Sequence, residues 1–184
     1  MHTIKKSFFS LFFIFSSIDL ISQDIEEIIV KGNWRESKSI EQDSSIVILK
    51  NNILESQPVK HFENLSYLVP NLNFAASDSR ARHFQIRGIG ERSGYERTPN
   101  SAVGILIDDI DYSGQGGIAT TFDIDQVEVH RGPQGSRIGS NALAGLIYIK
   151  TKEPTAEYEG ITEITSGSFG TLNAGIAFGG PSAF

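Results

Sequence analysis

The sequence predicts an α+β fold, in which a small mixed-sheet domain with short helices is followed by a β-hairpin. Between residues 46 and 154, short apolar runs rich in β-branched residues alternate with breaks that contain Gly or Pro, and one run has a helical period. After residue 158 the pattern changes to strict alternation on both sides of a glycine turn. Strands mixed with few helices and short loops are typical of an α+β domain.

The elements of the domain follow from local signals. A helix is predicted to open at Pro58 and to end at Pro70, because apolar residues between them recur at helical spacing and the residue before a proline avoids the helical region. Asp108 and Asp109 are predicted to form a tight turn between two strands. A short helical turn is expected within residues 136–141. Strands are predicted at 46–49, 85–87, 103–107, 110–112, 127–130 and 146–149.

The strand around residue 128 has alternating side chains. Val127 and Val129 alternate with Glu128 and His130. Because successive side chains of a strand point to opposite faces, we expect one buried face and one face in contact with water.

The N-terminus has the pattern of a secretory signal. Lys5 and Lys6 precede the apolar run 8–15, and small residues such as Ser22 follow it. The apolar run is too short to cross a bilayer, which takes about 20 residues. Residues 1–22 are therefore predicted to be a signal peptide.

A second apolar run follows the signal, within residues 24–32. The β-branched residues 28–30 favour an extended strand. Residues 33–45 are polar and charged without an apolar period, and are predicted to be a linker. We therefore expect the strand to lie unpaired outside the domain, or to pair with another protein.

The last segment, residues 158–184, is predicted to form a hairpin around the turn at 167–170. Its second strand has one apolar face and one face of small or polar residues. A transmembrane barrel strand has this pattern, with lipid on one side and the lumen on the other. A soluble hairpin has it equally, and the pattern alone leaves both open.

The composition excludes several classes of protein. The net charge of -6 argues against nucleic-acid binding, and the absence of Cys excludes disulfides and thiolate metal sites. The acidic loop after residue 108 lacks the closing Glu of a calcium site, because Thr120 stands there. His61, His83 and His130 lack metal-ligand spacing and are expected at the surface or at sheet edges. No enzyme activity and no cofactor are predicted.

Five segments, taken in order and spacing, resemble the TonB-dependent outer-membrane receptor family. They are Glu27–Gly32, Leu68–Leu72, Gln85–Gly90, Ile107–Ile110 and a last segment made of Val127–Gly135 followed by Gly139–Ile149. The first is similar to the family's TonB box, with Lys31 where Thr is common. The fourth is similar to its Asp-Gly hairpin, with Asp109 where Gly is usual.

The resemblance implies a plug domain at residues 46–154, preceded by a TonB box at 24–32 and followed by the first strands of the barrel that the plug fills. Such barrels have about 22 strands of about 10 residues, so most of the barrel would be missing from this chain. The residues implied to bind TonB are Glu27, Ile28, Ile29, Val30, Lys31 and Gly32. Arg87 and Arg131 are implied to contact the receptor's own barrel.

The resemblance also implies a location in the outer membrane, with the plug and TonB box facing the periplasm. The implied partners are TonB with its inner-membrane energising complex, the receptor's own barrel, membrane lipid and a scarce nutrient. A ferric siderophore, an iron chelate, is the default nutrient, while cobalamin, haem and oligosaccharides stay open.

Two other functions are compatible with the residues alone. One is a self-standing periplasmic interaction domain that pairs its N-terminal strand with a partner protein. The other is an exported hydrolase that uses Asp108, Asp109 or Asp111. The small number of strands after the domain favours a truncated receptor over a complete transporter.

Overall fold

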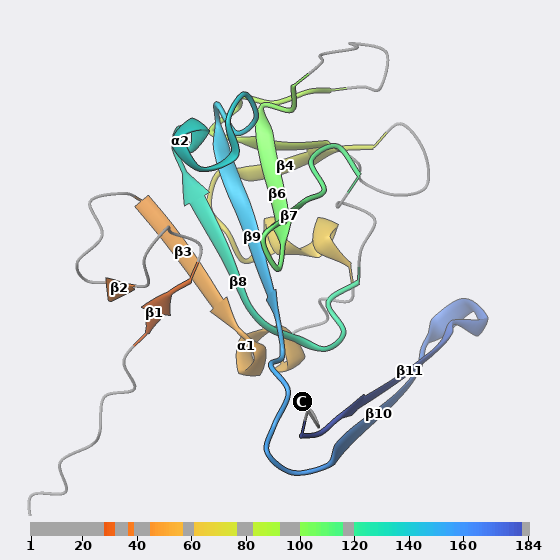
Figure 1. Cartoon of the computed structure of the whole chain (residues 1–184). Coiled ribbons are helices and arrows are strands. Elements are labelled where there is room, and N and C mark those ends of the chain that lie inside the picture. Colours follow the sequence, from red (N-terminus) through yellow and green to blue (C-terminus); the bar gives the residue numbers. More distant parts are fainter. Residues whose placement is uncertain are drawn as a thin grey trace, which may run out of the picture.

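The centre of the molecule is a five-stranded mixed sheet with the order β3-β8-β9-β6-β7 (Figure 1). The computed structural model describes residues 28–31, 37–38, 45–56, 61–76, 83–92, 100–115 and 120–181. The strands of this sheet are β3 (Ser45–Lys50), β6 (Val103–Ile107), β7 (Ile110–Asp111), β8 (Ile124–Arg131) and β9 (Gly145–Thr151). Strand β8 runs antiparallel to both neighbours, whereas β6 and β9 are parallel. The predicted α+β class and mixed sheet are confirmed.

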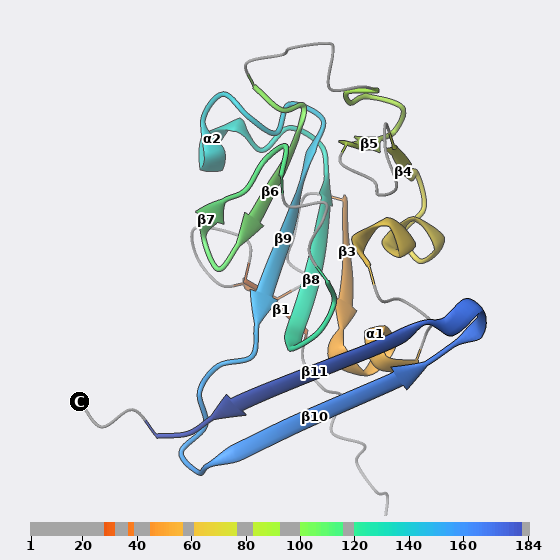
Figure 2. The same ribbon diagram turned by 90° about the vertical axis from the view of Figure 1, so that its right-hand side faces the viewer.

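The main hydrophobic core lies on one face of this sheet. It is closed by the helix α1 (Asn51–Ser56), the 3₁₀ helix η2 (Phe62–Tyr67) and the hairpin of β4 (Leu72–Ala75) and β5 (His83–Ile86). Figure 2 shows η2, β4 and β5 beside the sheet on the side of β3 and β8. Buried residues from these elements, such as Phe62, Leu65 and Ile86, pack against Val127 and Val129 of β8. Burial of such side chains is the main favourable contribution to folding.

The opposite face of the sheet carries a smaller cluster. Leu106, Leu146 and Tyr148 pack there with Ala142, under the short helix α2 (Gly135–Ile138). A separate two-stranded sheet also belongs to the described structure, formed by β1 (Ile29–Val30) and β2 (Ser37–Lys38). Side chains of β8 contact β1, so both faces of β8 are covered.

The expectation that one face of β8 is in contact with water is wrong. Glu128 and His130 are both 0% exposed. The alternation itself is correct, since these side chains point away from the core that contains Val127 and Val129. A register shift between Ile124 and Gln126 interrupts it, and such a bulge allows Ile124 to join the same core.

The predicted helix between Pro58 and Pro70 is shorter and tighter than expected. Within the described residues it is a 3₁₀ helix that ends at Tyr67, while Pro58 lies outside them. The apolar positions were informative, since Phe62, Leu65 and Val69 are all buried. Helix α1 was not predicted, because its six residues include only two large apolar side chains and show no period.

The C-terminal strands form the predicted hairpin. Strand β10 (Glu159–Ser166) pairs antiparallel with β11 (Leu172–Gly179) across a turn of η5 (Ser168–Gly170). The apolar stripe of β11 is exposed, including Leu172, Ile176 and Phe178. Figure 2 shows this hairpin crossing below the five-stranded sheet. None of the helices in the described ranges is long and apolar enough to cross a membrane.

Gly145 provides a test of how tightly β8 and β9 pack. A Cβ atom there would press against the backbone carbonyl oxygen of His130 and lie 2.6 Å from Ile86 Cδ1. We expect Gly145→Ala to lower the free energy of unfolding by about 1–3 kcal/mol through overpacking. Urea denaturation of the purified chain measures this. Gly135→Ala is the control, because nothing lies within 4 Å of its Cβ position, and a similar loss there would contradict the packing argument.

Candidate functional site

The predicted TonB-binding residues lie in and beside β1, which packs against the domain. Strand β1 pairs with β2 in the register Ile29 with Lys38 and Val30 with Ser37. Val30 is 0% exposed, whereas Ile28 and Ile29 are each 39% exposed. The expectation that this run lies unpaired outside the domain is therefore wrong for the residues that the structure describes. Glu27 and Gly32 lie outside the described residues.

Two polar side chains of β8 hold the backbone of this segment. The Gln126 amide Nε2 donates a hydrogen bond to the Ile29 carbonyl oxygen at 3.0 Å. The Lys31 backbone N–H donates to Glu128 Oε1 at 2.5 Å. The Lys31 ammonium forms an ion pair with Asp125 Oδ2 at 3.2 Å. Asp125 lies at the register shift of β8.

Glu128 is a buried carboxylate with several donors around it. Gln126 Nε2 donates to its Oε1 at 2.7 Å, and the His130 ring nitrogen Nε2 lies 2.9 Å from its Oε2. A buried carboxylate is costly unless it accepts such hydrogen bonds. The Nδ1 atom of His130 is buried and has no hydrogen-bond partner among the described residues. His130 is thus a buried residue of a central strand, and the expectation of a surface or edge position for it is wrong.

Arg87 and Arg131, predicted to contact a barrel, meet at one turn of the chain. Arg131 Nη1 donates to the Pro70 carbonyl oxygen at 3.4 Å, and the Arg87 backbone N–H donates to the Asn71 carbonyl oxygen at 2.9 Å. The Arg87 side chain is exposed, and Arg131 is partly buried. Arg131 Nε is buried and has no hydrogen-bond partner within the described ranges. The fold therefore brings the two arginines to the Pro70–Asn71 turn from distant positions in the sequence.

The three aspartates considered for hydrolysis all have structural partners. Asp109 Oδ1 accepts a hydrogen bond from Arg137 Nη2 at 2.6 Å. Asp111 accepts from the Ser113 backbone N–H at 2.8 Å and from the Asn141 amide at 2.9 Å. Each carboxylate therefore serves to fix a turn. Among the described residues, no group of three His, Cys, Asp or Glu side chains is arranged to hold a metal ion.

Asp108 fixes the turn between β6 and β7 onto β9. The Thr151 hydroxyl donates to its Oδ2 at 2.6 Å and the Thr151 backbone N–H donates to its Oδ1 at 3.1 Å. Partial burial alone would raise the pKa of Asp108, but these hydrogen bonds and the charge of Lys150 outweigh it and lower the pKa. Asp108 is also one of the few residues other than Gly with a positive φ, of 46°.

Arg137 and Tyr148 form a second polar contact on the α2 side of the sheet. The Arg137 guanidinium carbon lies 5.0 Å from the centre of the Tyr148 ring, a cation–π contact. Burial, together with the negative charge of Asp109, raises the pKa of Tyr148 to about 12. Tyr148 therefore stays protonated and neutral at physiological pH.

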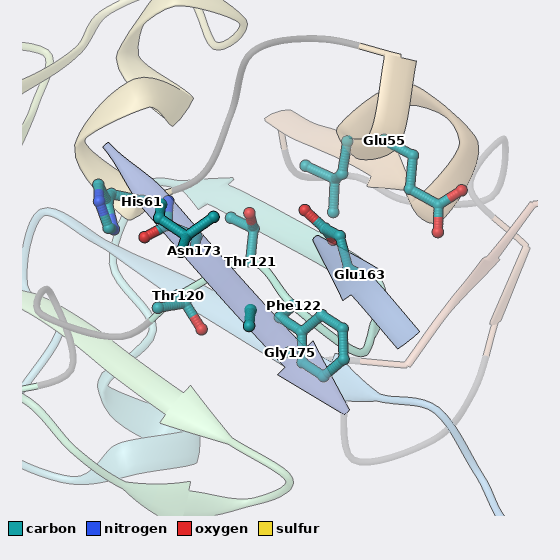
Figure 3. Close-up of a pocket in the computed structure, with 11 residues that line it drawn as sticks. Glu55, His61, Thr120, Thr121, Phe122, Glu163, Asn173 and Gly175 are labelled. Carbon is teal, nitrogen blue, oxygen red and sulfur yellow. The ribbon is translucent and has the colours of Figure 1, made fainter. Parts of the chain in front are cut away.

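A pocket of about 440 Å³ lies between the domain and the hairpin (Figure 3). Figure 3 shows Glu55 and Glu163 at one end of it and His61 and Asn173 at the other. Of the residues predicted to bind TonB or a barrel, none that the structure describes lines it. Phe122 packs against Gly175 of the hairpin, where a Cβ atom would lie 2.9 Å from its ring. The pocket thus lies at the boundary between the domain and β11.

Gln126 and Glu128 were not recognised from the sequence as contacts of the N-terminal segment. Their period of two on a strand is the pattern of a solvated face. No local signal distinguishes such a face from one that another segment of the chain covers. The two residues are separated by 97 positions from their partners.

A family model for the TonB-dependent receptor plug domain matches residues 38–146, more than half of the chain. The chain belongs to this family. Its members are transport receptors rather than enzymes. The matched range takes in β3, β6, β7 and β8 in full and the first two residues of β9, so this sheet is the body of the plug.

Curated relatives match about half of the chain at low identity. The pesticin receptor of Yersinia pestis is 28% identical over 102 residues, which cover 55% of this chain and 15% of the relative. The pesticin receptor of Yersinia enterocolitica matches to the same extent. The aligned region is thus a small fraction of each relative.

Solved structures agree with the plug fold. The ferric yersiniabactin uptake receptor of Yersinia pestis matches with a TM-score of 0.66 at 24% identity, covering 77% of this chain and 22% of that one. The ferripyoverdine receptor of the Pseudomonas aeruginosa outer membrane matches with a TM-score of 0.67 at 19% identity, covering 81% and 19%. At these identities the likeness concerns the fold.

The Asp108 contact predicts a pH dependence of plug stability. Because the folded pKa of Asp108 lies below its ordinary value of 3.8, the contact stabilises the plug above that value and is lost as the pH falls through the folded pKa. We expect Thr151→Val to lower the free energy of unfolding by about 1 kcal/mol at pH 7, allowing for partial exposure, and by less in acid.

Urea denaturation at neutral and acidic pH measures this difference. The control is Thr155→Val, whose hydroxyl donates to the Glu157 backbone carbonyl oxygen at 2.6 Å rather than to a carboxylate, so its loss adds no comparable pH dependence. An equal loss for Thr151→Val at both pH values would refute the role given to the Asp108 charge.

Proposed function

We propose that the chain is the plug region of an outer-membrane receptor for the energy-coupled uptake of a scarce nutrient, with an iron chelate as the ligand. The match of the plug family to residues 38–146 carries this proposal. Similar solved structures include receptors named for ferric yersiniabactin and for ferripyoverdine, which supports an iron chelate as the ligand. No ligand contact is assigned to any residue.

The proposed partner of the N-terminal segment is TonB, with the inner-membrane complex that energises it. Residues Glu27, Ile28, Ile29, Val30, Lys31 and Gly32 would add as a strand to the edge of a TonB sheet. In this mode, main-chain hydrogen bonds supply affinity and alternate side chains set the register. The extended conformation of Ile29 and Val30 is already the one that such pairing requires.

The proposed partner of Arg87 and Arg131 is the wall of the receptor's own barrel. A guanidinium pairs with a carboxylate through two parallel hydrogen bonds, which suits a contact that must hold while partly buried. The position of both residues at the Pro70–Asn71 turn supports a single contact region for them.

The hairpin of β10 and β11 would be the start of that barrel. Its exposed apolar stripe, with Leu172, Ile176 and Phe178, supports a surface that faces lipid. We propose that the receptor lies in the outer membrane, with the plug and the TonB-binding segment on the periplasmic side.

The TonB-binding proposal predicts the effect of a proline in the segment. Ile28→Pro removes one backbone donor and limits φ, so it should abolish TonB-dependent uptake while leaving ligand binding to whole cells intact. The backbone bonds that hold the segment to β8 come from Ile29 and Lys31 and would remain. Uptake and binding of a radiolabelled ferric siderophore by the receptor that carries this plug measure both effects. Ile28→Val is the matched control, and normal uptake by Ile28→Pro would refute the proposal.

The barrel-contact proposal predicts the effect of removing one arginine. Arg131→Ala should weaken the attachment of the plug and reduce uptake at least severalfold, whereas Arg131→Lys should retain part of it, since Lys keeps the charge without the paired geometry. Protease sensitivity of the plug in isolated outer membranes reports attachment directly. Wild-type protection and uptake in Arg131→Ala would make Arg131 an ordinary surface residue.

A further inference from the structure

The turn between β6 and β7 has a backbone conformation that its residues do not favour. Asp108 and Asp109 are its two central residues, with φ of 46° and 69°. A two-residue hairpin turn with positive φ at both positions strongly prefers Gly at the second, because a side chain there crowds the backbone. Since the second position is Asp109, the turn needs a contact that offsets the cost of this conformation.

The compensating contact comes from α2. Asp109 Oδ1 accepts a hydrogen bond from Arg137 Nη2 at 2.6 Å, between residues 28 positions apart in the sequence. The Asp109 side chain is 69% exposed, whereas the Arg137 side chain is 11% exposed. Figure 2 shows α2 next to the hairpin of β6 and β7. Arg137 is thus the fixed partner, and it holds an Asp109 side chain that is otherwise surrounded by water.

Arg137 is itself fixed by the sheet. Its guanidinium carbon lies 5.0 Å from the centre of the Tyr148 ring, and Tyr148 is 2% exposed. Ile138, the next residue of α2, packs against the cluster that contains Leu106. Arg137 Nε is buried and has no hydrogen-bond partner among the residues that the structure describes. Loss of Asp109 would leave a further donor of this guanidinium without a protein partner, which is costly for a largely buried cation.

The same turn is tied to the end of β9. Asp108 accepts hydrogen bonds from the Thr151 hydroxyl at 2.6 Å and from the Thr151 backbone N–H at 3.1 Å. Thr151 is the last residue of β9, and the chain continues from it to the hairpin of β10 and β11. Asp108 reaches Thr151 only while the turn keeps its conformation. The turn therefore controls the end of the plug sheet from which the hairpin leaves.

We infer that Arg137 and Asp109 form a brace, which takes the place of a glycine in the β6–β7 turn and thereby positions Asp108 on Thr151. The brace joins α2, the turn and the end of β9 into one unit. Without Arg137, Asp109 would keep its unfavourable φ with nothing to offset it, so the turn would open more often. The brace concerns the plug alone and is independent of the proposed ligand and of TonB.

A double-mutant cycle between positions 109 and 137 tests the brace. Urea denaturation of the full chain gives the equilibrium constant of unfolding for each variant. With Arg137 in place, Asp109→Gly should raise this constant at least about twofold, because a buried guanidinium loses its partner. In Arg137→Met, which keeps the stem over Tyr148, Asp109→Gly should lower it at least about twofold, because only backbone strain is removed. A change of the same sign in both backgrounds would overturn the brace.

Asp123 is the matched control for this cycle. It also has a left-handed φ, of 60°, but its side chain has no hydrogen bond or ion pair among the described residues. Asp123→Gly should therefore lower the unfolding constant by the same factor whether residue 137 is Arg or Met. An effect at Asp123 that depends on residue 137 would mean that Arg137→Met disturbs the whole sheet, and would count against the brace.

Hydrogen exchange of the Thr151 amide separates positioning from general stability. In Arg137→Met this amide should exchange at least about threefold faster, because its acceptor Asp108 is less well placed. The Val127 amide, in the central strand β8, should change only as far as the unfolding constant does. Adding Asp109→Gly to Arg137→Met should restore part of the protection of Thr151. An unchanged Thr151 exchange rate in Arg137→Met would overturn the positioning role of Arg137.

Discussion

The burial of β8 on both faces is the constraint on which the rest of the structure depends. Val127 and Val129 anchor the main core on one side, where most of the buried apolar area lies. On the other side Gln126, Glu128 and His130 are also buried, and polar groups can be buried only when their hydrogen bonds are made within the protein. The N-terminal segment supplies some of these bonds, so its docking and the integrity of the sheet are linked.

Strand β8 therefore carries residues for two different contacts of the plug. The same strand carries the side chains that hold the N-terminal segment and, at its last residue, the arginine proposed to face the barrel. The polar residues do not form a metal-binding group within the described part of the chain. They order turns and hold backbone, which is what a domain of a transport receptor requires.

Local sequence signals, namely turn residues and the period of apolar side chains, predicted much of the fold. The Asp108–Asp109 turn, the hairpin around residues 167–170 and most strands follow from turn residues and side-chain period. The helix near Phe62 was located correctly from its apolar period but is a 3₁₀ helix. Helix α1 has too few residues to show a period. Of the candidate site residues, the sequence named Ile29, Val30 and Lys31 but not the residues of β8 that hold them.

The sequence by itself determined which side chains share a face, because the alternation of a strand is a property of the backbone alone. The β-branched side chains of residues 28–30 predicted an extended segment. The short apolar runs predicted strands that pack around a buried core. Only the tertiary structure decided what covers each face. Whether Glu128 meets water or the Lys31 amide depends on a contact between residues 97 positions apart, and no local pattern encodes such a contact.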